Sequence, residues 1–179
     1  MSQTATATVD YASSSTGVPT GKLGMWVFLA SEVMFFTGLI AAYVVLRMGH
    51  PAWPGPEGHL SVPLGTINTF ALIASSMTIV MALAALQEGK PPAMRRWLLA
   101  TIGLGSLFLG IKAIEYSAKF SHHIFLSTTI FWSCYYTLTG FHALHVLGGV
   151  LFNLWVWQLS FKPVWARRSH RLELAGLYW

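Results

Sequence analysis

The sequence has 179 residues, of which 54% are hydrophobic and only 9% are charged. An average soluble domain carries roughly 25% charged residues, so these side chains cannot supply the polar shell that a soluble domain of this length needs. The net charge of +5 does not indicate nucleic-acid binding, because the basic residues lie in short gaps between apolar runs. The composition therefore predicts a membrane protein.

Residues 1–22 are rich in Ser, Thr and Ala and lack the basic start and the continuous apolar stretch of a signal peptide. We expect a disordered tail here, followed by one transmembrane helical domain over residues 23–179. A single cysteine, Cys134, excludes an intrachain disulfide and a metal cluster held by thiolates.

Four apolar runs follow the tail, and a helix needs ~20 residues to cross a hydrocarbon core of about 30 Å. The sequence therefore predicts an all-α, polytopic transmembrane bundle with four spans. The fourth is the longest and is expected to tilt or to protrude from the bilayer. The predicted spans are Leu23–Leu46, Leu64–Leu86, Trp97–Tyr116 and about Ser127 to Leu159.

The basic residues of the gaps predict the orientation. Eight lie on the side of the N-terminus and two on the other side, and cytoplasmic loops are enriched in Lys and Arg. We therefore expect the N-terminus in the cytoplasm. The eight are Lys22, Lys90, Arg95, Arg96, Lys162, Arg167, Arg168 and Arg171, and the two are Arg47 and Lys119.

Glu32 lies nine residues into the first predicted span, roughly 13 Å along its axis. A carboxyl group at that depth is unfavourable and marks a functional or tightly packed site. Its helical neighbours are apolar, so desolvation favours the protonated form unless a partner intervenes. Two interpretations stay open: a protonatable or lipid-contacting group in a cleft, and a protonated carboxyl hydrogen-bonded to a neighbouring helix.

Four other polar residues lie within the spans. Lys112 and Glu115 are three residues apart on one helix face, which favours a structural ion pair near the outer end. His142 and His145 lie on the same side of one helix, whereas two haem ligands must approach opposite faces of the iron. We therefore expect interhelical hydrogen bonds from these histidines, with small residues such as Gly38, Gly110 and Gly149 at close helix contacts.

No phosphate-binding loop, HExxH, CxxC or nucleophile-elbow motif is present, and the gaps are too short for a soluble catalytic domain. The lack of these motifs and the short gaps predict a membrane bundle without catalytic chemistry of its own.

Several segments, in order, resemble subunit III of the haem-copper oxidases. GMWVFLASEVMFFTGLIAAYVVLR resembles the helix that carries the family's buried glutamate, and PLGTINTFALIASSMT resembles its LLNT segment. IKAIEY and TGFHALHVLGG are similar to two further motifs, and the match covers Leu23 to Trp179.

The resemblance implies a short, five-span bacterial form of the subunit, in which Tyr178 and Trp179 open a last span expected after Trp179. Glu32 would be the family's buried carboxylate and Glu115 the acid of the IEY segment, with His142 and His145 the histidine pair. Lys112 departs from the family pattern, which more often has Gln there.

The function implied is that of a non-catalytic membrane subunit of a proton-pumping cytochrome c oxidase in aerobic respiration. Such a subunit flanks oxidase subunit I, in a complex with subunit II, binds phospholipid, and supports proton uptake and stability of subunit I. Haem and copper would be held by the partner subunits, with no metal or cofactor on this chain and no nucleic-acid partner. The expected location is the bacterial inner membrane.

A cluster of basic and aromatic residues beyond the fourth span is suited to bind anionic lipid headgroups. Arg47, at the opposite end of the bundle, is a further candidate for headgroup binding. Plain positive-inside topology explains the same residues equally well. The cluster comprises Lys162, Trp165, Arg167, Arg168 and Arg171.

Two other functions stay open: an accessory membrane protein of a nitric oxide reductase, and an autonomous proton or ion transporter that uses Glu32, Lys112 and Glu115. The sequence leaves undecided whether cytochrome c or a quinol donates electrons, which lipids bind, and whether the complex joins a larger assembly.

Overall fold

The computed structural model describes residues 19–55, 62–121, 123, 125–162, 165 and 169–179. Four long helices in these ranges are long and apolar enough to cross a membrane, which confirms the predicted all-α bundle with four spans. The chain is therefore a multi-pass membrane protein. Its helices are α1 (Thr20–Gly49), α2 (Val62–Gln87), α3 (Pro91–Ser121), α4 (Ile130–Leu159) and the short α6 (His170–Tyr178).

The helices extend beyond the apolar runs that predicted them. Residues 20–22, expected in the tail, form the start of α1, whereas residues 1–18 lie outside the described part. α3 continues well past both predicted ends, Trp97 and Tyr116. A helix satisfies its own backbone hydrogen bonds, so its polar terminal turns can project into the headgroup region.

The fourth span is shorter than predicted. α4 begins at Ile130 because Thr129, in an extended conformation, caps it: its side-chain oxygen accepts a hydrogen bond from the Trp132 N–H at 3.4 Å. α4 then has 30 residues, the same number as α1. At roughly 45 Å it still exceeds a hydrocarbon core of about 30 Å, as expected, but it is no longer than α1 or α3.

α2 and α3 form an antiparallel hairpin. The turn between them uses Gly89, whose φ of +69° is the left-handed conformation that glycine adopts without strain. The Lys90 N–H donates to the Ala85 carbonyl at 2.9 Å, which satisfies one of the last carbonyls of α2. Farther along, the hydroxyls of Thr78 and Thr101 are hydrogen-bonded at 2.8 Å between the two helices.

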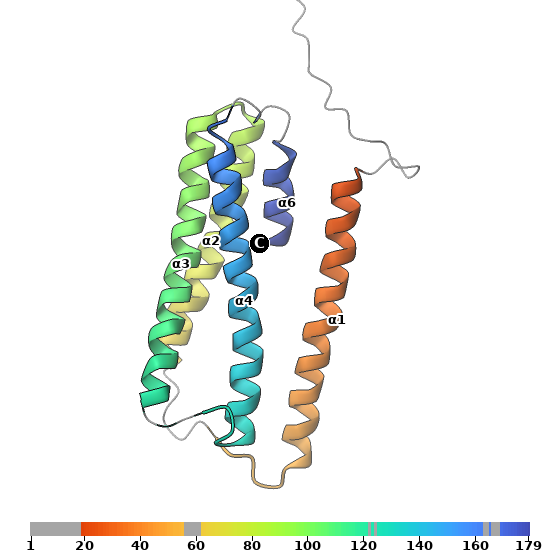
Figure 1. The fold of residues 1–179 in the computed structure, drawn as a ribbon, viewed down its shortest axis with the longest axis vertical. Helices are drawn as coiled ribbons and strands as arrows, with labels where there is room; N and C mark the ends of the chain where they lie inside the picture. The colour runs from red at the N-terminus through yellow and green to blue at the C-terminus, as the bar shows by residue number, and fades with distance from the viewer. Residues whose placement is uncertain (1–18, 56–61, 122, 124, 163–164, 166–168) are drawn as a thin grey trace, which may run out of the picture.

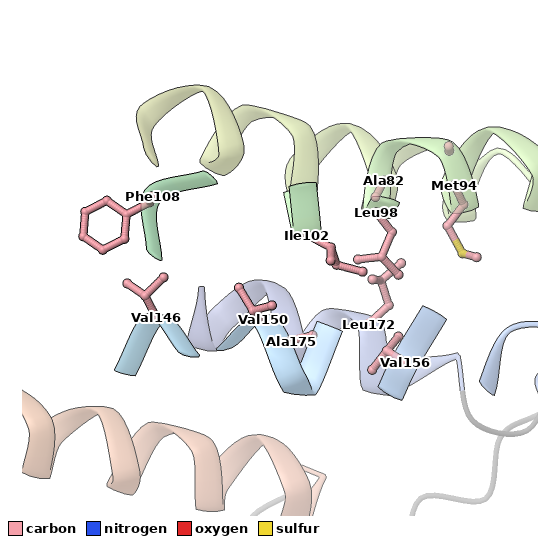
Figure 2. Packing of buried hydrophobic residues seen from close by; sticks show 11 residues of the cluster. Ala82, Met94, Leu98, Ile102, Phe108, Val146, Val150, Val156, Leu172 and Ala175 are labelled. Atoms are coloured by element: carbon pink, nitrogen blue, oxygen red, sulfur yellow. The ribbon is translucent and has the colours of Figure 1, made fainter. Parts of the chain in front are cut away.

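The hydrophobic core lies among α2, α3, α4 and α6. Figure 2 shows Leu98 and Ile102 of α3 pointing toward Val150 of α4 and Leu172 of α6. Leu98 and Leu172 are fully buried. α1 lies beside this cluster in the same view and contributes no residue to it.

The end of α6 is fixed by Trp179. A Cβ atom on Gly105 of α3 would lie 2.6 Å from the Trp179 ring, and one on Gly149 of α4 would lie 2.8 Å from it. Only glycine leaves room for the ring at both places. The indole N–H of Trp179 donates to the Ser75 hydroxyl of α2 at 3.0 Å, so one residue joins three helices.

The prediction of close contacts at small residues is thus confirmed for Gly149 and is wrong for Gly38 and Gly110. Among the described residues, and leaving out the backbone of the same helix, no atom lies within 4 Å of a Cβ atom placed on either of these two. A small residue permits a close helix contact, but the position of the neighbouring helix decides whether one forms.

Arg95 joins the start of α3 to the end of α4. Its Nε donates to the Ser160 hydroxyl at 3.1 Å and a terminal guanidinium nitrogen donates to the Ser160 carbonyl at 2.5 Å. The guanidinium carbon also lies 4.1 Å from the centre of the Phe161 ring. One side chain therefore provides a hydrogen-bond donor at the end of α4 and a stacking contact.

α1 stands apart from the other helices and has no buried residue (Figure 1). At the end where the chain enters, Lys22 pairs with Glu173 of α6 at 2.5 Å, and the Phe28 ring stacks on Tyr178 at 5.8 Å between centroids. α6 therefore connects this half of α1 to the core.

Candidate functional site

Glu32 and His145 form a polar contact between α1 and α4. Oε2 of Glu32 lies 2.5 Å from Nε2 of His145, and the side chains are 25% and 30% exposed. The other ring nitrogen of His145, Nδ1, lies 2.7 Å from the Phe141 carbonyl oxygen. Since a carbonyl only accepts, Nδ1 carries a hydrogen, and Nε2 is the ring nitrogen that faces the carboxyl group.

This pair faces a cavity of about 320 Å³ between α1, α2, α4 and α6. Most of the lining is apolar or aromatic, including Phe28, Phe36 and Leu72. The ring of Phe36 meets that of His145 edge-on at 5.2 Å. Glu32 thus combines features of both interpretations drawn from the sequence: it faces a cavity, and it is held by a neighbouring helix.

His142 is one turn before His145 but packs differently. Its ring meets Phe108 of α3 edge-on, with 5.7 Å between centroids, and lines the cavity beside Glu32. Of the two predicted interhelical histidines, only His145 contacts a polar group of another helix in the described structure. Across the described ranges, no group of three or more His, Cys, Asp or Glu side chains is arranged to hold a metal ion.

A second polar site, the lysine–glutamate cluster, comprises Lys112, Glu115, Lys119 and Tyr135. Glu115 accepts from Lys112 at 2.8 Å through Oε2 and from Lys119 at 2.6 Å through Oε1. Tyr135 of α4 donates to Glu115 Oε1 at 2.6 Å and accepts from both lysines. Lys119 also lies 5.1 Å from the centre of the Trp132 ring.

The structure therefore pairs Lys112 with Glu115 as their spacing predicted, and adds two residues that the sequence analysis missed. Lys119 could have been found, because it follows Glu115 by four residues and so shares its helix face. The predicted span ends at Tyr116, so the sequence assigns Lys119 to the segment between the third and fourth spans. Tyr135 comes from another helix, and no local pattern indicates it.

A second cavity, of about 450 Å³, is lined by residues from α1 to α4. Lys112 lines one part, and His142 lines both this cavity and the one beside Glu32. Asn68 of α2 is also in the lining and is only 2% exposed.

The headgroup candidates within the described residues have different surroundings. The guanidinium of Arg171 lies 4.6 Å from the Trp155 ring centre, whereas Lys162 is exposed and Trp165 packs against the core. At the opposite end, Arg47 donates to the Tyr43 hydroxyl at 3.2 Å. Two further candidates, Arg167 and Arg168, lie outside the described residues.

Comparisons with known proteins agree with this architecture. A family model described as Cytochrome c oxidase subunit III matches residues 5–179. Cytochrome c oxidase subunit 3 of Thermostichus vulcanus is 40% identical over 161 residues, which are 88% of this chain and 78% of the relative. The protein of the same name from Corynebacterium diphtheriae is 35% identical over 162 residues, 88% of this chain and 79% of the relative.

A relative with a different name is also similar. Quinol oxidase subunit 3 of Bacillus subtilis is 30% identical over 158 residues, which are 88% of this chain and 78% of that protein. The family resemblance seen in the motifs around Glu32, Glu115 and His145 is therefore confirmed over nearly the whole sequence. The chain belongs to the cytochrome c oxidase subunit III family and is a subunit of a haem-copper oxidase, acting with the other subunits of that complex.

Proposed function

We propose that this chain is the non-catalytic membrane subunit that flanks subunit I of a proton-pumping oxidase, beside subunit II, and stabilises subunit I during turnover. Haem and copper belong to the partner subunits, and this chain supports proton uptake without holding a redox centre. The observation that carries the proposal is the position of Glu32, whose carboxyl group contacts His145 within the chain. In this proposal, Glu32 holds α1 against α4 beside an apolar cavity.

The outer surface of α1 supports this proposal. Large apolar side chains there are exposed, among them Trp26, Val33 and Met34 at 59%, 67% and 76%. A contiguous apolar face on a membrane helix is covered either by acyl chains or by another subunit. Both fit a subunit that lies at the side of a larger membrane protein and binds phospholipid.

A Glu32→Ala variant of the complete oxidase tests the role of Glu32. Initial turnover is expected to stay close to that of the native complex, whereas activity is expected to decay faster during sustained turnover. Glu88→Ala is the matched control, because Glu88 lies in the turn after α2 and its ion pair in the described structure is with exposed Lys90. Complete and immediate loss of turnover in Glu32→Ala would show that Glu32 is catalytic.

Purification and reconstitution test the subunit role itself. The tagged chain is expected to co-purify with a haem-containing large subunit, and alone to show no haem absorption band. A nitric oxide reductase in the purified complex would replace the oxidase assignment. Flux driven by a pH gradient through the chain alone, abolished by Glu32→Ala, would favour an autonomous transporter and overturn the proposal.

The proposed orientation places the N-terminus in the cytoplasm of a bacterial cell, with the chain in the inner membrane. The single cysteine makes this measurable, because Cys134→Ser leaves a background without thiols. A cysteine placed at exposed Met48 is expected to react with a membrane-impermeant maleimide added outside spheroplasts, and one at exposed Lys162 is not. The reverse labelling pattern would overturn the orientation.

A further inference from the structure

The turn patch, which comprises Phe120, Phe125 and Leu126, is an exposed apolar surface where the chain passes from α3 to α4. The three side chains are 46%, 47% and 54% exposed. Residues 120–129 include no Asp, Glu, Lys or Arg, although surfaces that face water are usually rich in them. None of the three residues lines either cavity described above. An exposed apolar patch of this kind indicates contact with a membrane or with a partner.

The turn patch continues a series of stacked aromatic rings that begins in the interior. Tyr136 of α4 is buried, and its ring stacks on that of Phe120 with 5.7 Å between centroids and 14° between planes. The Phe120 ring stacks on that of Phe125 at 6.0 Å and 20°. The rings therefore lead from the inside of the bundle to its surface, and this packing holds Phe125 in place.

Hydrogen bonds within the connection support the same arrangement. The Phe125 N–H donates to the Thr128 hydroxyl at 2.8 Å, and the Thr128 N–H donates to the Phe125 carbonyl at 3.1 Å. The Ser133 hydroxyl of α4 donates to the Leu126 carbonyl at 2.5 Å. Backbone groups that are hydrogen-bonded within the protein can leave water without losing a partner. The turn can therefore present its apolar side chains to a region that holds little water.

The level of the turn patch along the bundle matches the edge of the hydrocarbon core. α4 has 30 residues and is roughly 45 Å long, so a core of about 30 Å centred on it leaves roughly 7 Å of helix beyond each edge. Ser133 and Tyr136, which contact Leu126 and Phe120, lie three and six residues after the start of α4. These separations are roughly 5 Å and 9 Å along the axis. The patch therefore lies where headgroups meet acyl chains.

We propose that the turn patch is a membrane anchor, in which Phe120, Phe125 and Leu126 insert at the boundary between headgroups and acyl chains on this side of the membrane. Interfacial segments insert Phe and Leu side chains roughly 5–10 Å into this boundary. The depth and the lack of charge favour this environment over water, and over a water-exposed domain of another protein, which would lie beyond the headgroups.

An anchor of this kind requires only that the chain spans the membrane, so it is independent of the role proposed for the chain within the oxidase. Its contacts are apolar, and it therefore needs no particular headgroup. It is in this respect different from the phospholipid binding proposed above.

Photo-crosslinking in the complete oxidase, reconstituted in bilayers, tests the proposal. A diazirine amino acid in place of Leu126 reacts on illumination with whatever surrounds it, and mass spectrometry of the chain separates adducts of lipid, water and polypeptide. Lipid adducts are expected to predominate, equally in phosphatidylcholine and in phosphatidylglycerol. The same amino acid in place of Phe125 provides a second site. In place of Glu88, in the exposed turn after α2, it is expected to give water adducts.

Matched variants separate the patch from the rest of the bundle. Phe125→Ser is expected to shift the adducts at position 126 from lipid toward water, because it removes a neighbouring apolar side chain. Lys90→Gln, in the exposed turn after α2, is expected to leave them unchanged. Co-purification of each variant with the large subunit shows that the complex has assembled, and its loss would bear on the subunit role alone.

Three results would overturn the anchor. Water adducts at positions 125 and 126 as abundant as at position 88 would show that the turn faces water. Capture of polypeptide in place of lipid would show that another protein covers the patch. Lipid adducts confined to phosphatidylglycerol would assign the contact to headgroup charge.

Discussion

Glu32 of α1 and His145 of α4 meet at 2.5 Å, and this contact lies on the inner stripe of a helix that buries none of its residues. α1 otherwise touches α4 through rings, such as the edge-on pair of Phe35 and Phe141 with 5.0 Å between centroids. Contacts between aromatic rings persist when a helix turns slightly about its axis. A contact between a carboxyl group and an imidazole nitrogen is kept only at one orientation of the helix about that axis. Glu32 and His145 therefore fix how α1 is turned toward the cavity.

This relationship predicts energetic coupling between the two residues. Glu32→Ala and His145→Ala are each expected to destabilise the chain, and the double variant is expected to be less destabilised than their sum by roughly 0.5–1.5 kcal/mol, the range of interhelical polar contacts in membranes. The measurement is reversible unfolding in mixed micelles titrated with dodecyl sulfate. Additive effects would show that the contact does not stabilise the bundle. The exposed Glu88–Lys90 pair provides the matched cycle, with no coupling expected.

Glu115 is expected to be the most sensitive residue of the lysine–glutamate cluster. Glu115→Ala leaves two buried lysines without a counter-charge, which is expected to cost about 3–5 kcal/mol of unfolding free energy. Combining it with Lys119→Met should recover part of this loss, because the second change removes one uncompensated charge. Unfolding of both variants is measured in the same micelles, with Glu88→Ala as an exposed control. A Glu115→Ala variant as stable as the native chain would contradict this account.

Gly149 is expected to tolerate no side chain, because a Cβ atom there would lie 2.8 Å from the Trp179 ring. Gly149→Ala is therefore expected to displace the ring and to cost about 1–3 kcal/mol, as overpacking does elsewhere. Indole fluorescence and thermal unfolding report this displacement. Gly103→Ala is the matched control, since no other described part of the chain comes within 4 Å of a Cβ atom at Gly103. It should be neutral or stabilising by up to about 1 kcal/mol.

Arg95 provides a test of how the ends of α3 and α4 are joined. Arg95→Ala removes both donors to Ser160 and the contact with Phe161. The expected cost is about 1–3 kcal/mol, because the Ser160 carbonyl loses a charged donor. Arg95→Lys keeps the positive charge but lacks the forked guanidinium. Its stability is expected to lie between that of the native chain and that of Arg95→Ala. Thermal unfolding is compared with that of Arg96→Ala, at an exposed neighbouring position; equal effects would contradict a specific role for Arg95.

Much of the fold could be predicted because its signals are local. Each long helix follows from a continuous apolar run, and the pairing of Lys112 with Glu115 follows from their spacing on one helix. The boundaries were less predictable, because hydropathy marks where lipid ends and not where the helix ends. Lys119 illustrates the difference: it lies beyond the apolar run yet within α3, where it reaches Glu115.

Contacts between helices could be predicted only as a tendency. Glu32 and His145 were both singled out as polar groups in spans, but their pairing depends on how α1 is rotated and which helix faces it. The same limit applies to Gly149 and Gly38, of which only the first packs closely on another helix. The sequence pattern of a helix shows which of its faces carries polar or small residues. Which neighbouring helix contacts that face depends on how the helices are arranged in space.

The attachment of α1 through α6 has a consequence for the order of assembly. α1 is the first of these helices to be synthesised, yet its contacts at Lys22 and Phe28 are with Glu173 and Tyr178, near the other end of the sequence. Contacts between residues so distant in sequence form late. The α2–α3 hairpin can close as soon as both helices have been inserted, whereas α1 must remain in the lipid without these partners until α6 has been made. A chain stalled before α6 is therefore the species whose first helix is exposed to capture by other membrane proteins.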